Sequence, residues 1–293
     1  MRLGIDLGGN KIEAAVLDET GAVRARRRVA TPRVYDEVLA ALTGLVAALE
    51  GEAGPVASIG VGTPGTRSPR TGLMQNAENT ALQGRAFDRD LAGVLGRPVR
   101  LANDALCFAL SEAVDGAGAG AGVVFGAIVG TGTGGAIVAG GRAIASAGGI
   151  GCEWGHNSLP WPTAGEAGVP CTCGRTSCVE AFLSGPGLER DHAVATGETT
   201  PAAVIVERAA AGEPAAVATL DRYVDRMARA LASVINLVDP DVIVLGGGVS
   251  RVDALYTEVP ARWGRWTATD SVVTRLVRSQ HGDASGVRGA AWL

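Results

Sequence analysis

The chain has 293 residues, of which 47% are hydrophobic and 19% are charged, and its formal net charge is −4 with a pI near 5.5. This length exceeds the usual size of one hydrophobic core, so we expect two domains around a cleft. The acidic balance gives no electrostatic reason to expect nucleic acid or an anionic membrane as a partner. Because no apolar run is long enough to span a bilayer and no signal-peptide pattern opens the chain, we expect a cytoplasmic protein.

A three-strand meander is predicted at the start of the chain, with strands that end at Asp6, span 12–17 and span 23–29. The first turn is rich in glycine, which lets backbone N–H groups face an anion without a Cβ in the way. Its candidate phosphate-binding residues are Asp6, Gly8, Gly9, Asn10 and Lys11. Asp6 is placed to hold Mg²⁺ through water, although a carboxylate that only closes a hairpin is the competing interpretation. The arginines within 24–28 are more typical of a solvated strand than of a binding patch.

Helices and buried strands alternate in the next part of the chain. In order, we expect helix 38–49, strand 57–61, helix 87–95, strand 99–102 and helix 104–114. The polar, turn-rich sequence between Gly62 and about Gly84 would let backbone approach a ligand. A segment rich in Gly and Ala, 115–122, is the candidate domain boundary.

The second half of the chain repeats the pattern of the first, with strand 123–129, a glycine turn, strand 136–139 and a further strand. This echo suggests two related halves that face each other. A long helix over 215–238, a buried strand over 241–245 and a last helix over 287–293 follow. One glycine hairpin alone would be weak support for a phosphate site, whereas two in matching positions favour a nucleotide in the cleft. The candidate nucleotide-binding residues of this half are Gly130, Thr131, Gly132, Thr133, Gly134, Gly246, Gly247 and Gly248.

Asp104 is the candidate catalytic base. Neither a Walker pattern nor a dinucleotide fingerprint is present, which favours kinase chemistry on another fold over dehydrogenase chemistry. Phosphoryl transfer to an alcohol needs a base that takes the hydroxyl proton. Asp104 stands where a strand ends and a helix begins, so its carboxylate would project from a rigid support. Helix capping by Asn103 or Asp104 explains the same position equally well, and the local sequence does not decide between them.

A zinc site is predicted between residues 153 and 180, where a histidine and three cysteines lie at short loop spacings. A tetrahedral site needs four such ligands, and they are His156, Cys171, Cys173 and Cys178. Since no position is left for water, the metal would be structural. The competing interpretation is three reduced thiols near an unrelated histidine. A zinc ribbon that binds nucleic acid is opposed by the acidic balance and by the lack of interleaved basic and aromatic residues.

Several motifs together resemble the ROK family (repressor, open reading frame, kinase) of the actin-like sugar-kinase superfamily, over essentially the whole chain. They are Asp6-Leu7-Gly8-Gly9-Asn10-Lys11, Leu101-Ala102-Asn103-Asp104-Ala105, the turn 130–135, Glu153-Trp154-Gly155-His156, CTCGRTSCVE from Cys171, and DPDVIVLGGG from Asp239. The resemblance implies an α/β fold of two actin-like (ribonuclease H-like) domains around a central cleft. Residues 1–115 and the C-terminal helix, about 282–293, would form one domain, and 116–281, with the zinc-binding loop 153–180, the other. It also suggests a homodimer.

The resemblance further implies a kinase that uses ATP and Mg²⁺ and in which Asp104 takes the proton of a sugar 6-hydroxyl. The other candidate sugar-binding residues are Gly65, Glu78, Asn79, Asn103, Glu153, His156 and Glu180. His156 would face the sugar with one ring nitrogen and the zinc with the other, which explains a structural metal so close to an active site.

Three positions depart from the family pattern. Asn10 replaces Thr, Ser177 replaces Gly, and the residues at 78–81, Glu-Asn-Thr-Ala, stand where the family has Asn-x-x-Trp. The last departure makes the identity of the sugar the least determined part of the prediction.

The segments EWGHNSLPW from Glu153 and HGDASGVRGAAWL from His281 look most like the bacterial fructokinase or manno(fructo)kinase group, with the N-acetylglucosamine kinases close behind. Fructose is therefore the first expected substrate, with mannose and glucose next and N-acetylhexosamines less favoured. Sugar-responsive repressors of the same family carry a helix-turn-helix domain ahead of the kinase-like body. Because the first strand is predicted from Arg2, we expect no such domain here.

Overall fold

The computed structural model describes residues 1–77, 80–144, 146 and 153–293. The chain forms two compact units. Unit 1 comprises residues 1–120, the described residues of 137–152 and residues 280–293, and unit 2 comprises 121–136 and 153–279. No helix within the described part of the chain has the length and apolar character that a membrane crossing requires.

A five-stranded sheet with the order β3-β2-β1-β4-β7 forms the centre of unit 1. Its strands are β1 (Arg2–Leu7), β2 (Lys11–Leu17), β3 (Val23–Ala30), β4 (Ser58–Thr63) and β7 (Arg100–Asn103), and a small hairpin joins β5 (Thr66–Arg67) to β6 (Met74–Gln75). Strands β1, β2 and β3 form an antiparallel meander, whereas β4 and β7 extend the sheet in parallel with β1. The predicted meander is therefore confirmed.

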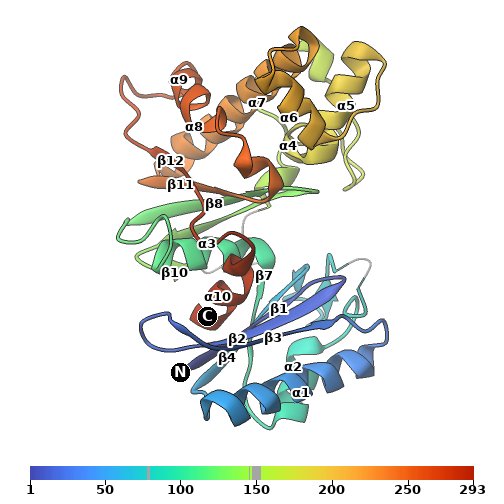
Figure 1. Cartoon of the computed structure of the whole chain (residues 1–293), viewed down its shortest axis with the longest axis vertical. Coiled ribbons are helices and arrows are strands. Elements are labelled where there is room, and N and C mark those ends of the chain that lie inside the picture. The colour runs from blue at the N-terminus through green and yellow to red at the C-terminus, as the bar shows by residue number, and fades with distance from the viewer. Residues whose placement is uncertain (78–79, 145, 147–152) are drawn as a thin grey trace. The chain divides into compact units, whose positions relative to one another are not determined.

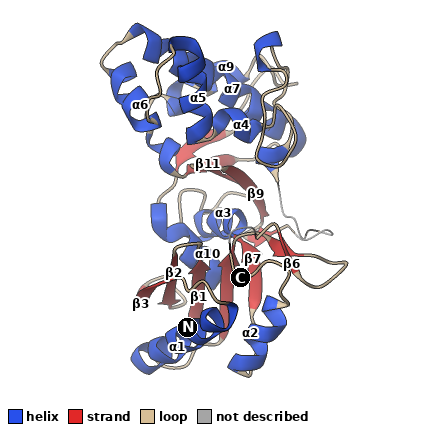
Figure 2. Ribbon diagram, turned by 90° about the vertical axis from the view of Figure 1, so that its right-hand side faces the viewer, coloured by secondary structure: helices blue, strands red, loops and turns tan. Residues whose placement is uncertain are grey.

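Helices cover both faces of this first sheet (Figures 1 and 2). Helices α1 (Tyr35–Ala53) and α2 (Phe87–Leu95) pack on the face that carries Leu3, Ile5 and Leu7. Helices α3 (Asp104–Val114) and α10 (Ser285–Trp292) lie on the other face. Gly4 and Gly60 permit this contact, because a Cβ on either would lie about 2 Å from a carbonyl oxygen of α10. The last helix of the chain thus packs on the first sheet and covers part of one of its faces.

The second sheet repeats the arrangement of the first, with the order β10-β9-β8-β11-β12. Its strands are β8 (Val123–Val129), β9 (Thr133–Ala139), β10 (Arg142–Ala143), β11 (Val242–Gly246) and β12 (Arg275–Arg278). Again β10 and β9 are antiparallel, while β8, β11 and β12 are parallel neighbours. The predicted α/β class with two related halves is confirmed. Strand β9 begins three residues earlier than the predicted 136–139, so part of the expected turn belongs to the strand.

The helices of unit 2 pack around the long helix α7 (Pro214–Val238). The others are α4 (Val179–Leu183), α5 (Gly185–Thr196), α6 (Ala202–Ala210), α8 (Leu255–Glu258) and α9 (Pro260–Trp263). The short 3₁₀ helices of the chain are η1 (Trp154–His156), η2 (Ala164–Glu166), η3 (Gly248–Arg251) and η4 (Gly282–Ala284). Sequence periodicity predicted α7 but neither α5 nor α6.

Candidate functional site

The two candidate acidic residues of unit 1 lie at the carboxyl ends of β1 and β7, the parallel strands on either side of β4. Asp6 on β1 is in register with Gly62 on β4, and Thr63 on β4 is in register with Asn103 on β7. Asp104 follows directly as the first residue of α3. Since neighbouring strands are roughly 4.8 Å apart, this edge gathers the two carboxylates on one side of the sheet.

Helix α3 is capped by Asn103 and not by Asp104. The Asn103 side-chain oxygen accepts a hydrogen bond from Leu106 N at 2.8 Å, which satisfies one of the free N–H groups of the first turn. Asp104 Oδ1 accepts a hydrogen bond from the adjacent Ala105 N, at 2.8 Å. The capping interpretation therefore applies to Asn103, and the carboxylate of Asp104 is not required for it.

Burial changes the acidity of both carboxyl groups. Asp104 is solvent-accessible, yet the surrounding protein desolvates its carboxyl enough to raise its pKa. Burial, assisted by the carboxylate of Asp104 and opposed by Lys11, raises the pKa of Asp6 to about 6. Part of this burial comes from α10, because a Cβ on Gly286 would lie 2.9 Å from Asp6 Oδ2. Perturbed carboxyl groups at a strand-end edge are a feature of catalytic sites.

The first glycine hairpin is closed by its own backbone, since Gly8 N donates to Lys11 O at 2.9 Å. Thr31 supports it by donating its hydroxyl to Gly8 O at 2.7 Å, and Arg33 donates to the side chain of Asn10. Lys11 is exposed at the end of the turn. The arginine run on β3 has a structural role that the sequence did not reveal, because Arg26 and Arg28 both pair with the buried Glu13.

The second glycine hairpin, in unit 2, lies against the glycine turn after β11. A Cβ on Gly247, whose φ is +83°, would lie 2.4 Å from Val129 O, so only glycine fits there. Gly130 O accepts a hydrogen bond from Gly185 N at 2.7 Å. The structure thus brings together the predicted nucleotide residues of this half, Gly130, Thr131, Gly132, Thr133, Gly134, Gly246, Gly247 and Gly248.

Glu180 connects this hairpin to the loop 153–180 that carries His156 and the three cysteines, which we call the cysteine loop. Its Oε2 accepts a hydrogen bond from Thr133 N at 3.0 Å, and its Oε1 accepts one from the Thr172 hydroxyl at 2.9 Å. Both carboxylate oxygens therefore have protein partners in this structure. The expected sugar contact of Glu180 stays a prediction.

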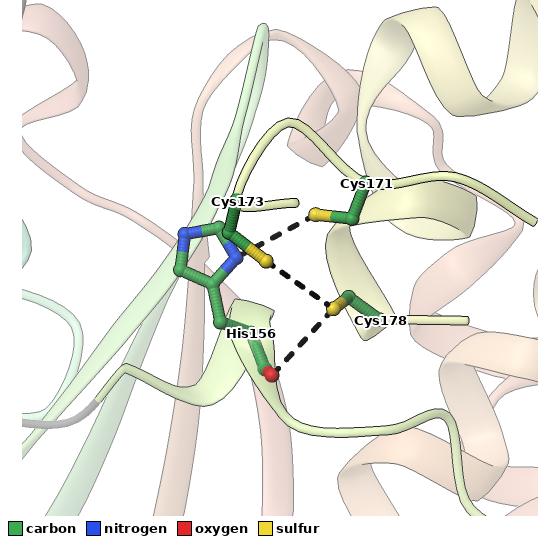
Figure 3. A group of neighbouring side chains, drawn as sticks. All are labelled: His156, Cys171, Cys173 and Cys178. Atoms are coloured by element: carbon green, nitrogen blue, oxygen red, sulfur yellow. Dashed lines mark hydrogen bonds between the residues drawn. The ribbon is translucent and has the colours of Figure 1, made fainter. Parts of the chain in front are cut away.

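The candidate metal centre is formed by the side chains of His156, Cys171, Cys173 and Cys178, whose ligand atoms all lie within 4.8 Å of one another (Figure 3). His156 turns Nδ1 toward the sulfurs, 3.7 Å from Cys171 Sγ, and its other ring nitrogen away from them. The sulfurs of Cys173 and Cys178 are also 3.7 Å apart. Zinc bonds of about 2.3 Å to sulfur and 2.0–2.1 Å to nitrogen would separate tetrahedral ligand atoms by roughly 3.5–3.8 Å. The donor set and its spacing therefore fit a structural zinc ion.

Tight turns hold the cysteines in place. Cys171 N donates to Arg175 O at 2.9 Å, and Cys178 precedes α4 as its N-cap residue. Ser177, which stands where the family pattern has Gly, has a φ of +57°. A side chain in this left-handed region is strained. The strain is offset by two hydrogen bonds, because the Ser177 hydroxyl donates to Glu166 O at 2.9 Å and accepts from Gly168 N at 3.0 Å.

A buried ion-pair network anchors the cysteine loop to α7, and sequence analysis missed it. Glu166 is 4% exposed and accepts hydrogen bonds from Arg226 at 2.8 Å and from Arg229 at 2.7 Å. Burial opposes ionisation of Glu166, but the two guanidinium groups outweigh it and hold its pKa at about 2. Arg229 also donates to the carbonyl oxygens of Pro160 and Trp161. The available signal was a pair of arginines inside an otherwise apolar helix face.

Of the remaining predicted sugar residues, the structure describes Gly65 and Glu153. Gly65 has a φ of +71°, and a Cβ there would lie 2.2 Å from Gln75 O, so this turn requires glycine. Glu153 directly precedes η1. Glu78 and Asn79 lie outside the described residues.

Comparison with known proteins identifies similar chains over the full length. The model described as "ROK family" matches residues 2–293. N-acetyl-D-glucosamine kinases from Photobacterium profundum and Pectobacterium atrosepticum are 38% and 39% identical, and the alignments cover 100% of this chain and 99% and 98% of those proteins.

Among solved structures, the ROK hexokinase from Thermus thermophilus is 33% identical with a TM-score of 0.89, covering 99% of this chain and 96% of that one. A ROK family glucokinase from Streptomyces griseus, solved with glucose and AMPPNP, is 28% identical with a TM-score of 0.77, covering 99% of this chain and 97% of that one. The two related sheets are thus those of two actin-like domains, as the sequence predicted.

Proposed function

The chain belongs to the ROK family of sugar kinases, and we propose that it transfers the γ-phosphate of ATP to the 6-hydroxyl of N-acetyl-D-glucosamine. The observation that carries the choice of sugar is the full-length similarity, at 38–39% identity, to two N-acetyl-D-glucosamine kinases. Sequence motifs had placed fructose first and N-acetylhexosamines behind it. The similarity to these two relatives supports the opposite order.

In unit 1, Asp104 is the proposed base and Asn103 a proposed sugar ligand. A desolvated carboxylate with a raised pKa is better matched to accept a hydroxyl proton near neutral pH than an ordinary aspartate. Asn103 uses its side-chain oxygen for the helix cap, so its amide group would donate to a sugar hydroxyl. Both residues are supported by β7 and α3, which limits their motion.

The glycine turns are the proposed phosphate contacts, with Asp6 holding Mg²⁺ through water. The Gly8–Lys11 hairpin in unit 1 and the paired turns of unit 2 offer backbone N–H groups without blocking side chains. Lys11 would add a positive charge near the donor phosphates. When bound, Mg²⁺ neutralises charge on the phosphates.

In unit 2 the proposed zinc ion would be held by Cys171, Cys173, Cys178 and Nδ1 of His156. Its contribution would be to fix the loop. The other nitrogen of His156 would then be held in one orientation for a sugar hydroxyl. Glu153 and Glu180 are proposed as further sugar contacts from the same wall.

Fructose is the second candidate, and one observation favours it. The segment EWGHNSLPW that carries His156 resembles the fructokinase group. In fructose C2 is the anomeric carbon, whereas in N-acetyl-D-glucosamine the anomeric carbon is C1 and C2 carries the acetamido group, so the two sugars make different demands on the same pocket. A direct competition between the two sugars therefore separates the candidates.

The test is an ADP-release assay with Mg-ATP and a panel of N-acetyl-D-glucosamine, fructose, mannose and glucose. We expect the highest kcat/KM with N-acetyl-D-glucosamine and a loss of about 10²–10⁴-fold in kcat for Asp104→Asn. Asp36→Asn, at an exposed acid on α1, is the matched control. A higher kcat/KM with fructose would reverse the choice of sugar. Failure to phosphorylate any sugar would refute the kinase proposal, and full activity in Asp104→Asn would remove the base.

A further inference from the structure

Glu112, near the end of α3, is a fully buried carboxylate that no predicted role has used. Its Oε2 accepts hydrogen bonds from Ala117 N at 3.0 Å and Gln280 N at 2.9 Å. Its Oε1 accepts from His281 N at 3.1 Å and from the Ser285 hydroxyl at 2.9 Å. Within the described ranges no Lys or Arg forms a salt bridge with it. Four uncharged donors therefore stabilise one buried charge.

Three of the four donors lie close to the first and the last of the points at which the chain passes between its two units. Ala117 comes shortly before the chain first leaves unit 1 after Gly120, and Gln280 is the residue at which it returns for the last time. The returning segment is 168 residues from Glu112 in sequence. Gly116 is packed so closely that a Cβ would lie 2.4 Å from Glu112 Oε2. One side chain thus joins the outgoing and returning segments to α3.

Asp115 makes a second link between the same two segments. It accepts a hydrogen bond from Nε2 of His281 at 2.9 Å, from Arg288 and from Nε1 of Trp292 at 3.2 Å. These contacts are more exposed than those of Glu112 and include charged partners. We call these contacts of Glu112 and Asp115 the junction of unit 1. Glu112 forms its buried part, and Asp115 forms its more exposed part.

We propose that Glu112 is a positioning residue that fastens the first and the last of the chain crossings to unit 1, so that motion between the units leaves these two crossings ordered. Only a carboxylate can accept four hydrogen bonds in this arrangement. A glutamine side chain would turn its NH₂ group either toward the N–H donors of Ala117 and Gln280 or toward the His281 N–H and the Ser285 hydroxyl. In both orientations donors would face donors. Its effect on turnover rests on the proposed kinase function, because a kinase must close over its sugar to keep water from the γ-phosphate.

Hydrogen exchange on Glu112→Gln tests the fastening directly, without any substrate. We expect amides of both segments, 116–120 and 280–285, to exchange about tenfold faster together, at a temperature where the protein is folded by circular dichroism. Ser111→Ala is the matched control, because Ser111 is equally buried on the same helix and its hydroxyl has no partner among the described residues. We expect no change in exchange for this variant.

Turnover gives a readout that a purely structural residue would not move. In Glu112→Gln, we expect the ratio of sugar-independent ATP hydrolysis to sugar phosphorylation to rise several-fold, and in Ser111→Ala to stay constant. Unchanged exchange, or faster exchange in only one segment, would overturn the fastening. An unchanged hydrolysis ratio in an active enzyme would overturn its role in closure. If the protein phosphorylates no sugar, the exchange result alone decides the fastening.

Ser285→Ala keeps the proposal testable if Glu112→Gln does not fold, because it removes one donor and leaves the carboxylate in place. If Glu112 holds both segments together, the amide exchange rates in segment 116–120 should rise together with those in segment 280–285. A rise confined to 280–285 would overturn the proposal.

Discussion

The two units contain the same sheet order but hold their candidate functional residues in different ways. In unit 1, Asp6 and Asn103 stand at the ends of paired parallel strands, and Asp104 begins the following helix. In unit 2, His156 and the three cysteines stand on a loop with little regular structure. Packing of strands and helices holds the residues of unit 1 in place. The residues of unit 2 depend instead on the hydrogen bonds of their turns, on the ion pairs of Glu166 and on the proposed zinc ion. The difference predicts that local chemical changes disturb unit 2 more than unit 1.

Removal of one zinc ligand should give the largest effect. We expect Cys173→Ser to lower bound zinc well below about one ion per chain and to expose the loop 153–178 to proteolysis, because the metal supplies much of the free energy that orders such a loop. Metal content by mass spectrometry and limited digestion measure both results.

Cys107→Ala is the control for loss of a thiol. Cys107 is fully buried in unit 1 and lies under Gly62, outside the candidate metal centre. This variant should retain its zinc and its resistance to protease. Full zinc binding and an intact loop in Cys173→Ser would contradict the four-ligand assignment.

The buried Glu166 should give the next largest effect. In Glu166→Gln the guanidinium groups of Arg226 and Arg229 lose the buried carboxylate that they share and keep only Asp191 and Asp225, respectively, which we expect to cost up to about 3 kcal/mol. Four of the tryptophans, Trp154, Trp161, Trp263 and Trp266, lie in unit 2, so denaturant unfolding followed by tryptophan fluorescence reports mainly on this unit.

Glu52→Gln in unit 1 is the matched control for this ion pair. Its partner is Arg27, and the two side chains are 42% and 51% exposed. Solvent screens such a pair, so the free energy of unfolding should change by less than about 1 kcal/mol. Equal effects of the two variants would show that burial does not distinguish the pairs.

The difference between regular elements and contacts made only in the tertiary fold also explains which features could be predicted from the sequence. Regular periodicity located α3 over 104–114 and β8 over 123–129 at their observed bounds, and their ends place Asp104 and the second glycine hairpin. The cysteine and histidine spacing predicted the four side chains that the structure brings together as the candidate metal centre. The partners of Glu112 and Glu166 could not be predicted, because both carboxylates meet groups that only the tertiary fold brings near. Hydrogen bonds to Glu180 from Thr133 and Thr172 were missed for the same reason.

The smallest expected effect concerns His281 in unit 1. Its hydrogen bond with Asp115 raises the pKa of His281 above the usual 6.5, and Asp115 stays ionised because His281 and Arg288 outweigh its burial and lower its pKa. A raised folded pKa means that the stabilisation is fully present below pH 6.5 and is lost as pH rises through the folded value. His281→Asn should therefore lower Tm relative to the wild type at pH 6, and the difference should shrink by pH 8.5.

The pH dependence sharpens the comparison between the units. Glu166 in unit 2, with a pKa of about 2, keeps its charge over this whole range, so its ion pairs should not change with pH, whereas the hydrogen bond between His281 and Asp115 in unit 1 should. The expected change is below about 1 kcal/mol, because the pair is partly exposed and Arg288 still holds Asp115 when His281 is neutral. Differential scanning calorimetry of both proteins from pH 6 to pH 8.5 measures it. A Tm difference that is constant or grows with pH would mean that protonated His281 does not stabilise the junction.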